Sequence, residues 1–284
     1  MRNKEREAAA EAAAKYVKDS LDPKLNFLLP EVGIILGTGW GDTLLDKCKD
    51  YFAAFPLETL PGFEHLKEMP KIEGHDRELW LTTVNNKAVA MLRGRIHMNE
   101  THSGEELARM VRLQVEMLIK LGVKHLILTN AAGSLHPDIK VGDLVAHDGF
   151  IMVCAPPLPL WGGEFNSAED VLKRINIQRT KRSARRAGLV CHEGAGVMVR
   201  GPGFEGRKYD KKILSGFGAS MAMMSILPEA TVAALYPEVN VCAISFITNT
   251  ASEEHSHAEN QKRASESAGK LGDLLLNLIE SLPH

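Results

Sequence analysis

Apolar residues along this chain gather in short, compact runs, and stretches with helical spacing lie between them. The clearest runs are residues 32–36, 126–128 and 239–247. Each predicts a buried strand, because a strand that is covered on both faces is apolar throughout. Residues 105–121 instead repeat apolar positions every three or four residues and stop before Gly122, which predicts an amphipathic helix. Together these patterns favour the α/β fold class.

Other stretches predict further elements on the same grounds. Residues 5–21 predict a peripheral surface helix that rests on the body, with Tyr16 and Val17 on one side. A turn at Asn85-Asn86 is expected to join two strands into a hairpin. The remaining predicted elements are strands at 79–83, 88–92, 197–199 and 221–224, and helices at 168–187, after Pro228 and at about 260–282. Residues 144–146 and 150–153 are further apolar runs.

The stretch 126–143 joins a predicted strand to candidate chemistry. Its apolar run breaks into Ala131, Ala132 and Gly133, whose small side chains let backbone amides approach an anion or a sugar closely. The carboxyl end of a parallel strand is also where α/β sheets bind their ligands. For this stretch taken alone, an ordinary strand that ends in a tight turn stays open as the alternative.

A second candidate anion site follows the first predicted strand. Gly37-Thr38-Gly39 predicts a transition from the strand through a glycine turn into a helix. The Thr38 hydroxyl would then lie at the amino end of that helix, where backbone N–H groups and the helix dipole favour an anion. The segment lacks the lysine of a P-loop and the spacing of a dinucleotide fingerprint, so neither a nucleoside triphosphate nor NAD is indicated.

Arg95 and His97 form a third candidate site. In extended backbone, residues two apart point to the same side, so a guanidinium and an imidazole would lie together at the end of a strand. Arginine supplies bidentate donors and histidine a further donor, and the pair could clamp an oxyanion. The alternative is a surface arginine beside a buried histidine.

Phe204 and Glu205 form a fourth candidate site, at the end of the predicted strand 197–199. An aromatic ring followed by a carboxylate can stack on a flat heterocycle and accept hydrogen bonds from its ring N–H and exocyclic amine. Further along, three prolines between 156 and 159 force an irregular loop that carries Trp161 and Phe165. These aromatic residues indicate a lid, a subunit contact or a hydrophobic staple.

Composition excludes several classes of protein. The chain has 284 residues, a formal net charge of -2 and 25% charged residues, values typical of an ordinary globular protein. The basic helix at 168–187 has no interleaved aromatic residues for base stacking, so a solvated face is expected there and no nucleic acid partner. No apolar run approaches the roughly 20 residues of a membrane span, and a cytoplasmic protein is expected. One domain is expected over residues 1–284, with residues 1–25 as its peripheral helix.

The cysteines indicate neither a metal centre nor a disulfide scaffold. The chain has four cysteines, which lie far apart with no C-x-x-C pair, so they are expected to be buried thiols. They are Cys48, Cys154, Cys191 and Cys242.

Six short motifs stand out along the chain. They are Gly37-Thr38-Gly39, Gly94-Arg95-Ile96-His97, Thr129-Asn130-Ala131-Ala132-Gly133, Gly201-Pro202-Gly203-Phe204-Glu205, Met224-Ser225 with Pro228-Glu229, and Ile247-Thr248-Asn249. Their order and approximate spacing are those of the trimeric purine nucleoside phosphorylases, and from about residue 30 to its end the chain resembles this family. Two segments, 130–135 and 256–258, resemble most the bacterial inosine-guanosine or xanthosine branch.

The resemblance implies an architecture and an activity. The expected fold is a three-layer α/β/α sandwich around a mixed, partly barrel-like sheet, assembled as a homotrimer. Members of the family cleave the N-glycosidic bond of purine nucleosides with inorganic phosphate, giving ribose 1-phosphate and free base for purine salvage. Phosphate is a co-substrate, and no metal or organic cofactor is expected.

The resemblance also implies a role for individual residues. Asn249, Glu205 and His97 are the expected catalytic residues, and Phe165 is the aromatic residue expected to reach a neighbouring subunit. The phosphate ligands would be Thr38, Arg95, His97, the backbone at Ala131, and Ser225. The base would contact Phe204, Glu205 and Asn249, and the ribose would contact Asn99, Met224 and His257.

Three positions depart from the family pattern and keep other functions open. Asn99 stands where the family usually has tyrosine, Gly206 where it has threonine, and Met223 where it has glycine. One alternative is a methylthioadenosine phosphorylase, a related enzyme that shares the fold and often has threonine in the Gly-Thr-Gly turn. The other, left open by Asn99 and Met223, is a purine-binding homologue that has lost catalysis. Glu205 with Asn249 suits a 6-oxopurine better than a 6-aminopurine, and the retained phosphate-binding side chains favour an active enzyme.

Overall fold

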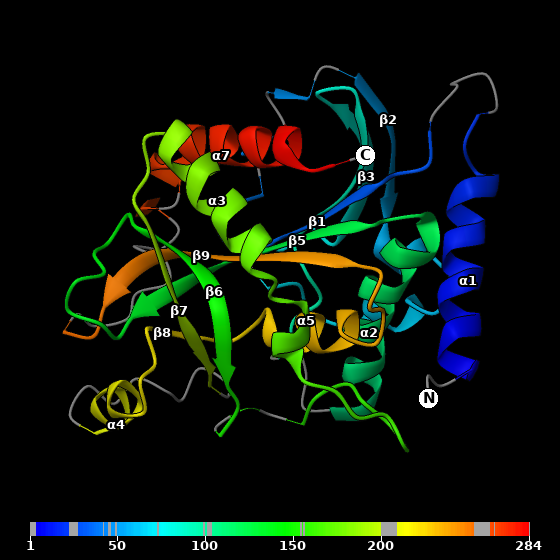
Figure 1. The fold of residues 1–284 in the computed structure, drawn as a ribbon. Coiled ribbons are helices and arrows are strands. Elements are labelled where there is room, and N and C mark those ends of the chain that lie inside the picture. Colours follow the sequence, from blue (N-terminus) through cyan, green and yellow to red (C-terminus); the bar gives the residue numbers. More distant parts are fainter. Residues whose placement is uncertain are drawn as a thin grey trace.

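The computed structural model describes residues 4–22, 28–41, 43–44, 47–48, 50–72, 74–98, 100, 104–153, 155, 157–199, 209–252, 262–263 and 265–283. Nine strands in this part of the chain form one mixed sheet (Figure 1). They follow one another across the sheet in the order β2 (Asp50–Pro56), β3 (Glu78–Val84), β4 (Lys87–Arg93), β1 (Val32–Leu36), β5 (His125–Ser134), β8 (Met221–Met223), β7 (Cys191–Met198), β6 (Leu144–Ile151) and β9 (Asn240–Thr250).

One half of this sheet closes on itself. The last strand in the order, β9, also pairs with β5, so that β5, β8, β7, β6 and β9 form a ring. The parallel pairing of β5 with β9 runs from His125 opposite Asn240 to Ser134 opposite Thr250. A closed ring leaves these strands without a free edge. The expected mixed, partly barrel-like sheet is confirmed.

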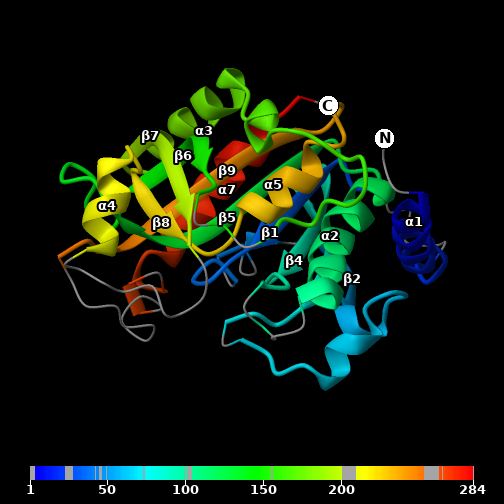
Figure 2. The same cartoon turned by 90° about the horizontal axis from the view of Figure 1, so that it is seen from below.

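Helices cover both faces of the sheet (Figures 1 and 2). One face carries α2 (Gly104–Leu121) and α5 (Leu227–Ala233), and the opposite face carries α3 (Arg174–Arg186) and α7 (Ala268–Ser281). Outside this sandwich, α1 (Lys4–Asp19) packs on α2, and α4 (Asp210–Gly216) lies beside β8. The three-layer arrangement is confirmed. Among the described residues, no helix is both long and apolar enough to span a bilayer.

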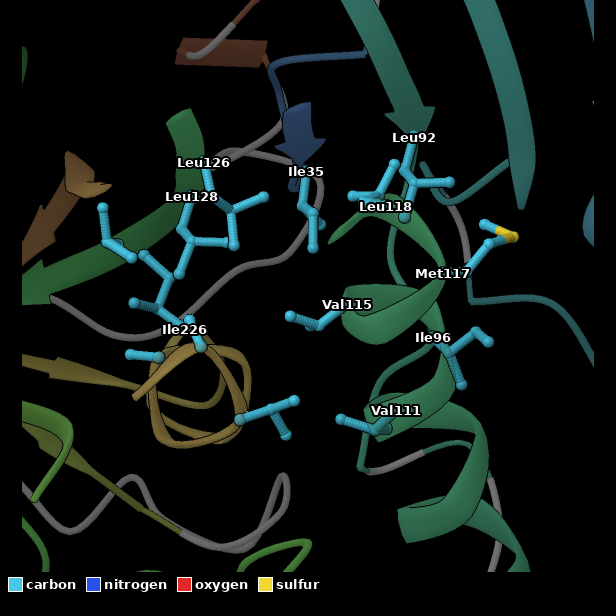
Figure 3. Packing of buried hydrophobic residues seen from close by; sticks show 14 of the residues in the cluster. Ile35, Leu92, Ile96, Val111, Val115, Met117, Leu118, Leu126, Leu128 and Ile226 are labelled. Carbon is cyan, nitrogen blue, oxygen red and sulfur yellow. The ribbon is translucent and has the colours of Figure 1, made fainter. Parts of the chain in front are cut away.

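The central strands divide their side chains between two cores. On β1, Ile35 faces the α2 side, whereas Ile34 and Leu36 join the core under α7. Figure 3 shows the first core, in which Val111 and Val115 of α2 point to the side of the helix where Ile35 and Ile226 lie. Because each strand is covered on both faces, its sequence is apolar throughout, as the compact runs predict.

Most predicted elements are confirmed, including the hairpin of β3 and β4, whose turn residues Asn85 and Asn86 both have positive φ. The apolar runs 144–146 and 150–153 largely belong to one strand, β6, which continues across a register shift near His147. Two expectations are wrong. Tyr16 is 45% exposed, while Val17 is buried against the body. Within residues 38–41 the chain forms a turn, and no α-helix follows it in the described residues up to 48. The helix expected at about 260–282 is confirmed for the described residues with one interruption: 262–263 and 265–266 are helical, residue 267 lies in a turn, and α7 follows from Ala268.

Candidate active site

The carboxyl ends of four parallel strands meet at one edge of the sheet and carry the candidate residues. Thr38 lies two residues beyond β1 and Arg95 two residues beyond β4, whereas Ala131 and Asn249 lie within β5 and β9. Ser225 follows β8, which pairs with the end of β5. In open α/β sheets this edge is the usual place for ligands.

The stretch of small residues lies in a strand rather than a loop. Ala131 and Gly133 belong to β5, which continues to Ser134 with a register shift opposite β9 after Ala132. The prediction that the strand ends before these residues is therefore wrong. Their small side chains still serve close approach, because the Asn249 amide nitrogen lies 3.1 Å from the point where a Cβ on Gly133 would stand.

Arg95 is buried, and its guanidinium is fixed by contacts on two sides. Its Nε donates to Oε1 of Glu229 at 2.6 Å, and its Nη2 donates to the backbone oxygen of Thr129 at 2.8 Å. Gly37 leaves room for this side chain, since a Cβ there would lie 2.5 Å from Nη1. Glu229 offsets the buried positive charge, and the guanidinium is held beside the end of β1.

His75 joins Thr38 to Arg95. Its Nε2 lies 3.3 Å from Oγ1 of Thr38, and its Nδ1 lies 2.8 Å from the backbone oxygen of Arg95. Its ring also meets the ring of His97 edge to face, with the centroids 6.1 Å apart. Thr38, His75, Arg95 and His97 therefore lie close together. Sequence reasoning missed His75, a single histidine in an irregular connector, and only the nearby Gly74 marks a turn there.

His97 does not share a strand face with Arg95, as the two-residue spacing predicts, because β4 ends at Arg93 and both residues lie in irregular backbone. The backbone N–H of His97 donates to Oε1 of Glu100 at 2.9 Å, and Glu100 is paired with buried Arg77 at 2.7 Å. Burial, with further contributions from His75 and Arg95, lowers the pKa of His97 to about 3. At neutral pH its imidazole is uncharged and can donate one hydrogen bond.

Ser225 is placed by a strained turn. The next residue, Ile226, has φ of 72°, a left-handed conformation that a β-branched side chain rarely adopts. Ile226 is fully buried in the core drawn in Figure 3, which holds it there. Behind Ser225, Nδ2 of Asn130 donates to its Oγ at 3.4 Å.

Asn249 is 7% exposed, and its carboxamide lies beside β5. Its Oδ1 accepts a hydrogen bond from Oγ1 of Thr248 at 3.2 Å. Met224 comes directly after β8 and next to Ser225. The arrangement brings hydroxyl, guanidinium and imidazole groups to the same sheet edge as a carboxamide, which fits an anion and a polar heterocycle bound side by side.

The remaining predicted site residues are either exposed or outside the described residues. The Phe165 side chain is 97% exposed in the single chain. Asn99, Phe204, Glu205 and His257 lie outside the described residues. Within the described ranges, no group of three or more histidine, cysteine, aspartate or glutamate side chains could hold a metal ion.

Comparison with known proteins identifies the family. The Phosphorylase superfamily matches residues 31–280. The purine nucleoside phosphorylase of Mycobacterium tuberculosis is 31% identical over 253 residues, which cover 88% of each chain. The purine nucleoside phosphorylase of Schistosoma mansoni in complex with adenosine has a TM-score of 0.80 at 27% identity and covers 97% of both chains, and a schistosome complex with hypoxanthine has the same values. These matches confirm the resemblance that the six motifs indicate. The chain belongs to the Phosphorylase superfamily and, within it, to the purine nucleoside phosphorylases.

Proposed function

We propose that this chain phosphorolyses 6-oxopurine nucleosides, namely inosine, guanosine and their deoxy forms, to free base and ribose 1-phosphate in purine salvage. Family membership supports a purine nucleoside as substrate. The observation that carries the proposal is the buried Arg95: its backbone oxygen contacts His75, which lies beside Thr38 and His97, and its guanidinium contributes to the lowered pKa of His97. The Asn249 carboxamide at the same sheet edge adds a partner for a purine.

The proposed phosphate ligands are Thr38, Arg95, His97, the backbone N–H at Ala131, and Ser225, with His75 added from its contacts. Arginine offers paired donors that match an oxyanion, while the neutral imidazole of His97 adds a donor without a second positive charge. A phosphate held there would lie beneath C1′ of the ribose. It would stabilise the positive charge that develops on the sugar as the glycosidic bond breaks. No metal or organic cofactor takes part in the proposed reaction.

Asn249 is proposed to bridge O6 and N7 of the purine and to donate more strongly as negative charge builds on the leaving base. Glu205 would accept from N1–H, and Phe204 would stack on the ring. The proposed ribose contacts come from Asn99, Met224 and His257.

Base preference rests on donors and acceptors rather than on similarity. The schistosome phosphorylases to which the chain is similar are described with adenosine and with hypoxanthine, so likeness to them does not select a base. A 6-aminopurine presents a donor at position 6 and an unprotonated N1. Asn249 and Glu205 therefore complement a 6-oxopurine better.

We further propose that residues 1–284 act as one domain, with residues 1–25 peripheral, in a cytoplasmic homotrimer. The exposed Phe165 ring supports this assembly, since a large apolar side chain left bare in one chain is suited to a subunit contact. In the trimer it would contribute to a neighbouring active site.

The proposal is tested by release of free base from inosine, guanosine, adenosine and methylthioadenosine, each with and without inorganic phosphate. Phosphate-dependent cleavage of the 6-oxopurines, with little cleavage of the other two, is the expected result. Preferential cleavage of methylthioadenosine would assign the sister activity. Release of base without phosphate would indicate a hydrolase, and no release at all would favour a purine-binding protein.

Asn249→Ala tests the role of the carboxamide. Because the proposed hydrogen bonds strengthen in the transition state, we expect kcat with inosine to fall about 100- to 1000-fold, with a smaller rise in KM. Steady-state kinetics at saturating phosphate provide the measurement. An unchanged kcat would remove Asn249 from the mechanism.

A further inference from the structure

A chain of buried side chains leads from the candidate site into the closed ring of strands. Nε2 of His147 lies 2.8 Å from Oγ of Ser245, whose hydroxyl donates to Oδ1 of Asn130 at 2.6 Å. Nδ2 of Asn130 then donates to Oγ of Ser225 at 3.4 Å. The four residues are between 0 and 7% exposed. This hydrogen-bonded chain, called the relay below, crosses from β6 through β9 and β5 to the turn after β8.

The fold holds the relay in register. Asn130 of β5 and Ser245 of β9 are paired directly in the parallel ladder, and Ser245 is also opposite Val145, two residues before His147 on β6. Gly196 of the neighbouring β7 makes room for the imidazole. A Cβ on Gly196 would lie 2.9 Å from Cε1 of His147. The relay therefore depends on the closed ring, in which β9 pairs with both β5 and β6.

The donors and acceptors allow only two directions for such a relay. In the first, His147 donates from Nε2 to Ser245, Ser245 donates to Asn130, and Asn130 donates to Ser225. The hydroxyl proton of Ser225 is then left to point elsewhere. In the second, the Asn130 amide is turned over, so that Ser225 donates to Asn130 and every later bond reverses. Ser225 would then present only lone pairs to an anion, which repel it.

The environment of His147 favours the first direction. Its Nδ1 is buried and has no hydrogen-bond partner among the described residues, so the proton is better placed on Nε2 facing Ser245. Burial also lowers the pKa of His147 to about 3, which keeps the ring neutral with a single N–H. The Phe150 ring, with its centroid 5.2 Å from that of His147, packs on the imidazole.

We propose that His147 is a positioning residue for the anion: by donating from Nε2 it sets the direction of the relay, so that the Ser225 hydroxyl donates its proton to bound phosphate. This inference rests on the proposed function, because it takes Ser225 as a phosphate ligand. His147 itself touches neither phosphate nor nucleoside, and it acts through Ser245 and Asn130.

The first test compares His147→Leu with His147→Gln. Leucine fills similar space without a hydrogen bond, whereas the glutamine amide can still donate to Ser245. We expect His147→Leu to raise the Kd of inorganic phosphate about tenfold in calorimetry, and its KM for phosphate likewise, with the KM for inosine little changed. His147→Gln should stay within about threefold of wild type. Phe150→Leu, which alters packing on the ring but no relay bond, is the matched control and should leave the Kd unchanged.

A double-mutant cycle separates the relay from general loosening of the fold. Once Ser225→Ala has removed the last hydroxyl, His147→Leu should cause no further loss of phosphate affinity. Additive losses, or an unchanged Kd in His147→Leu alone, would overturn the proposal. If His147→Leu does not fold, Ser245→Ala interrupts the relay at its middle and is judged by the same two criteria.

The two proposals fail in different ways. If the wild-type protein binds phosphate but cleaves no nucleoside, the proposed reaction is contradicted. The relay can still be tested, because calorimetry measures the Kd of phosphate in each variant. If the wild-type protein cleaves nucleosides with phosphate, but substitutions at His147 and Ser245 leave the Kd of phosphate unchanged, only the relay is contradicted. A wild-type protein that binds no phosphate overturns both.

Discussion

Gly37 is the residue on which the position of the Arg95 guanidinium depends most directly. A Cβ at this position would stand 2.5 Å from Nη1 of Arg95 and 2.6 Å from the backbone oxygen of Thr129. The second contact is with backbone, so the strand itself would have to move. We expect Gly37→Ala to lower kcat/KM for phosphate about 100-fold through misplacement of Arg95. It should also reduce the free energy of unfolding by about 1–3 kcal/mol.

Gly41 provides the matched control in the same turn. A Cβ there meets nothing within 4 Å, and its φ lies outside the left-handed region. Gly41→Ala should therefore keep wild-type kinetics and change the free energy of unfolding by less than about 0.5 kcal/mol. Equal effects of the two substitutions in phosphate kinetics and urea unfolding would mean that the close approach at Gly37 does not position Arg95.

At the residue scale, sequence identifies candidates by local motif and misses those that depend on folding. Thr38, Arg95 and Asn249 stand in short motifs near strand ends, and the structure brings them to one sheet edge. His75 and His147 stand in no motif. The first contacts Arg95 because a connector folds back over it, and the second reaches Ser245 only because β6 pairs with β9.

At the scale of the element, α2 combines a predictable pattern with an unpredictable one. Its apolar residues recur at helical spacing, and this spacing correctly predicts the helix and its buried face. Yet Arg112 and Glu116 are also buried, at 0% and 1% exposure. Charged residues are expected in solvent, and only their partners on other segments, Glu164 and Tyr236, account for their burial.

Buried Arg112 of α2 anchors the loop before Phe165 through an ion pair with Glu164. Arg112 donates from Nη1 and Nη2 to both oxygens of Glu164, at 2.6 and 2.8 Å, and from Nε to Glu116 at 2.9 Å. Arg112→Met would leave two carboxylates buried without their cation. We expect the free energy of unfolding in urea to fall by about 3–5 kcal/mol.

Arg109, one turn earlier on the same helix, is the control for Arg112. Its side chain is 49% exposed and lies 3.5 Å from Glu106, a surface pair of little net energy. Arg109→Met should change the free energy of unfolding by less than about 0.5 kcal/mol. Comparable losses from the two substitutions would show that the buried network contributes no more than a surface ion pair.

For the whole molecule, the feature that sequence patterns do not show is the closure of the ring. Apolar runs predict β5 and β9 as buried strands, but both continue through small or polar residues that, judged locally, indicate turns or strand ends. These continuations, 131–134 and 248–250, provide the last pairs between the two strands. Closure is a matter of strand length and register between distant segments, and hydrophobic periodicity in one segment carries no information on it.

The same burial makes the stability of the molecule depend on pH. Burial inside the ring lowers the pKa of His147 from 6.5 to about 3. Below pH 6.5 His147 is therefore protonated in the unfolded chain but stays neutral in the folded protein, so the free energy of unfolding falls as the pH falls. From this residue we expect a decline of at most about 1.4 kcal/mol per pH unit between pH 6.5 and 5, and no contribution above that range.

In urea unfolding at several pH values, His147→Gln should flatten this slope. His65→Gln, at a side chain that is 61% exposed, should keep the wild-type slope. If His147→Gln leaves the slope unchanged, His147 takes up its proton in the folded protein as readily as in the unfolded chain. His147 would then not be the neutral hydrogen-bond donor that the relay requires.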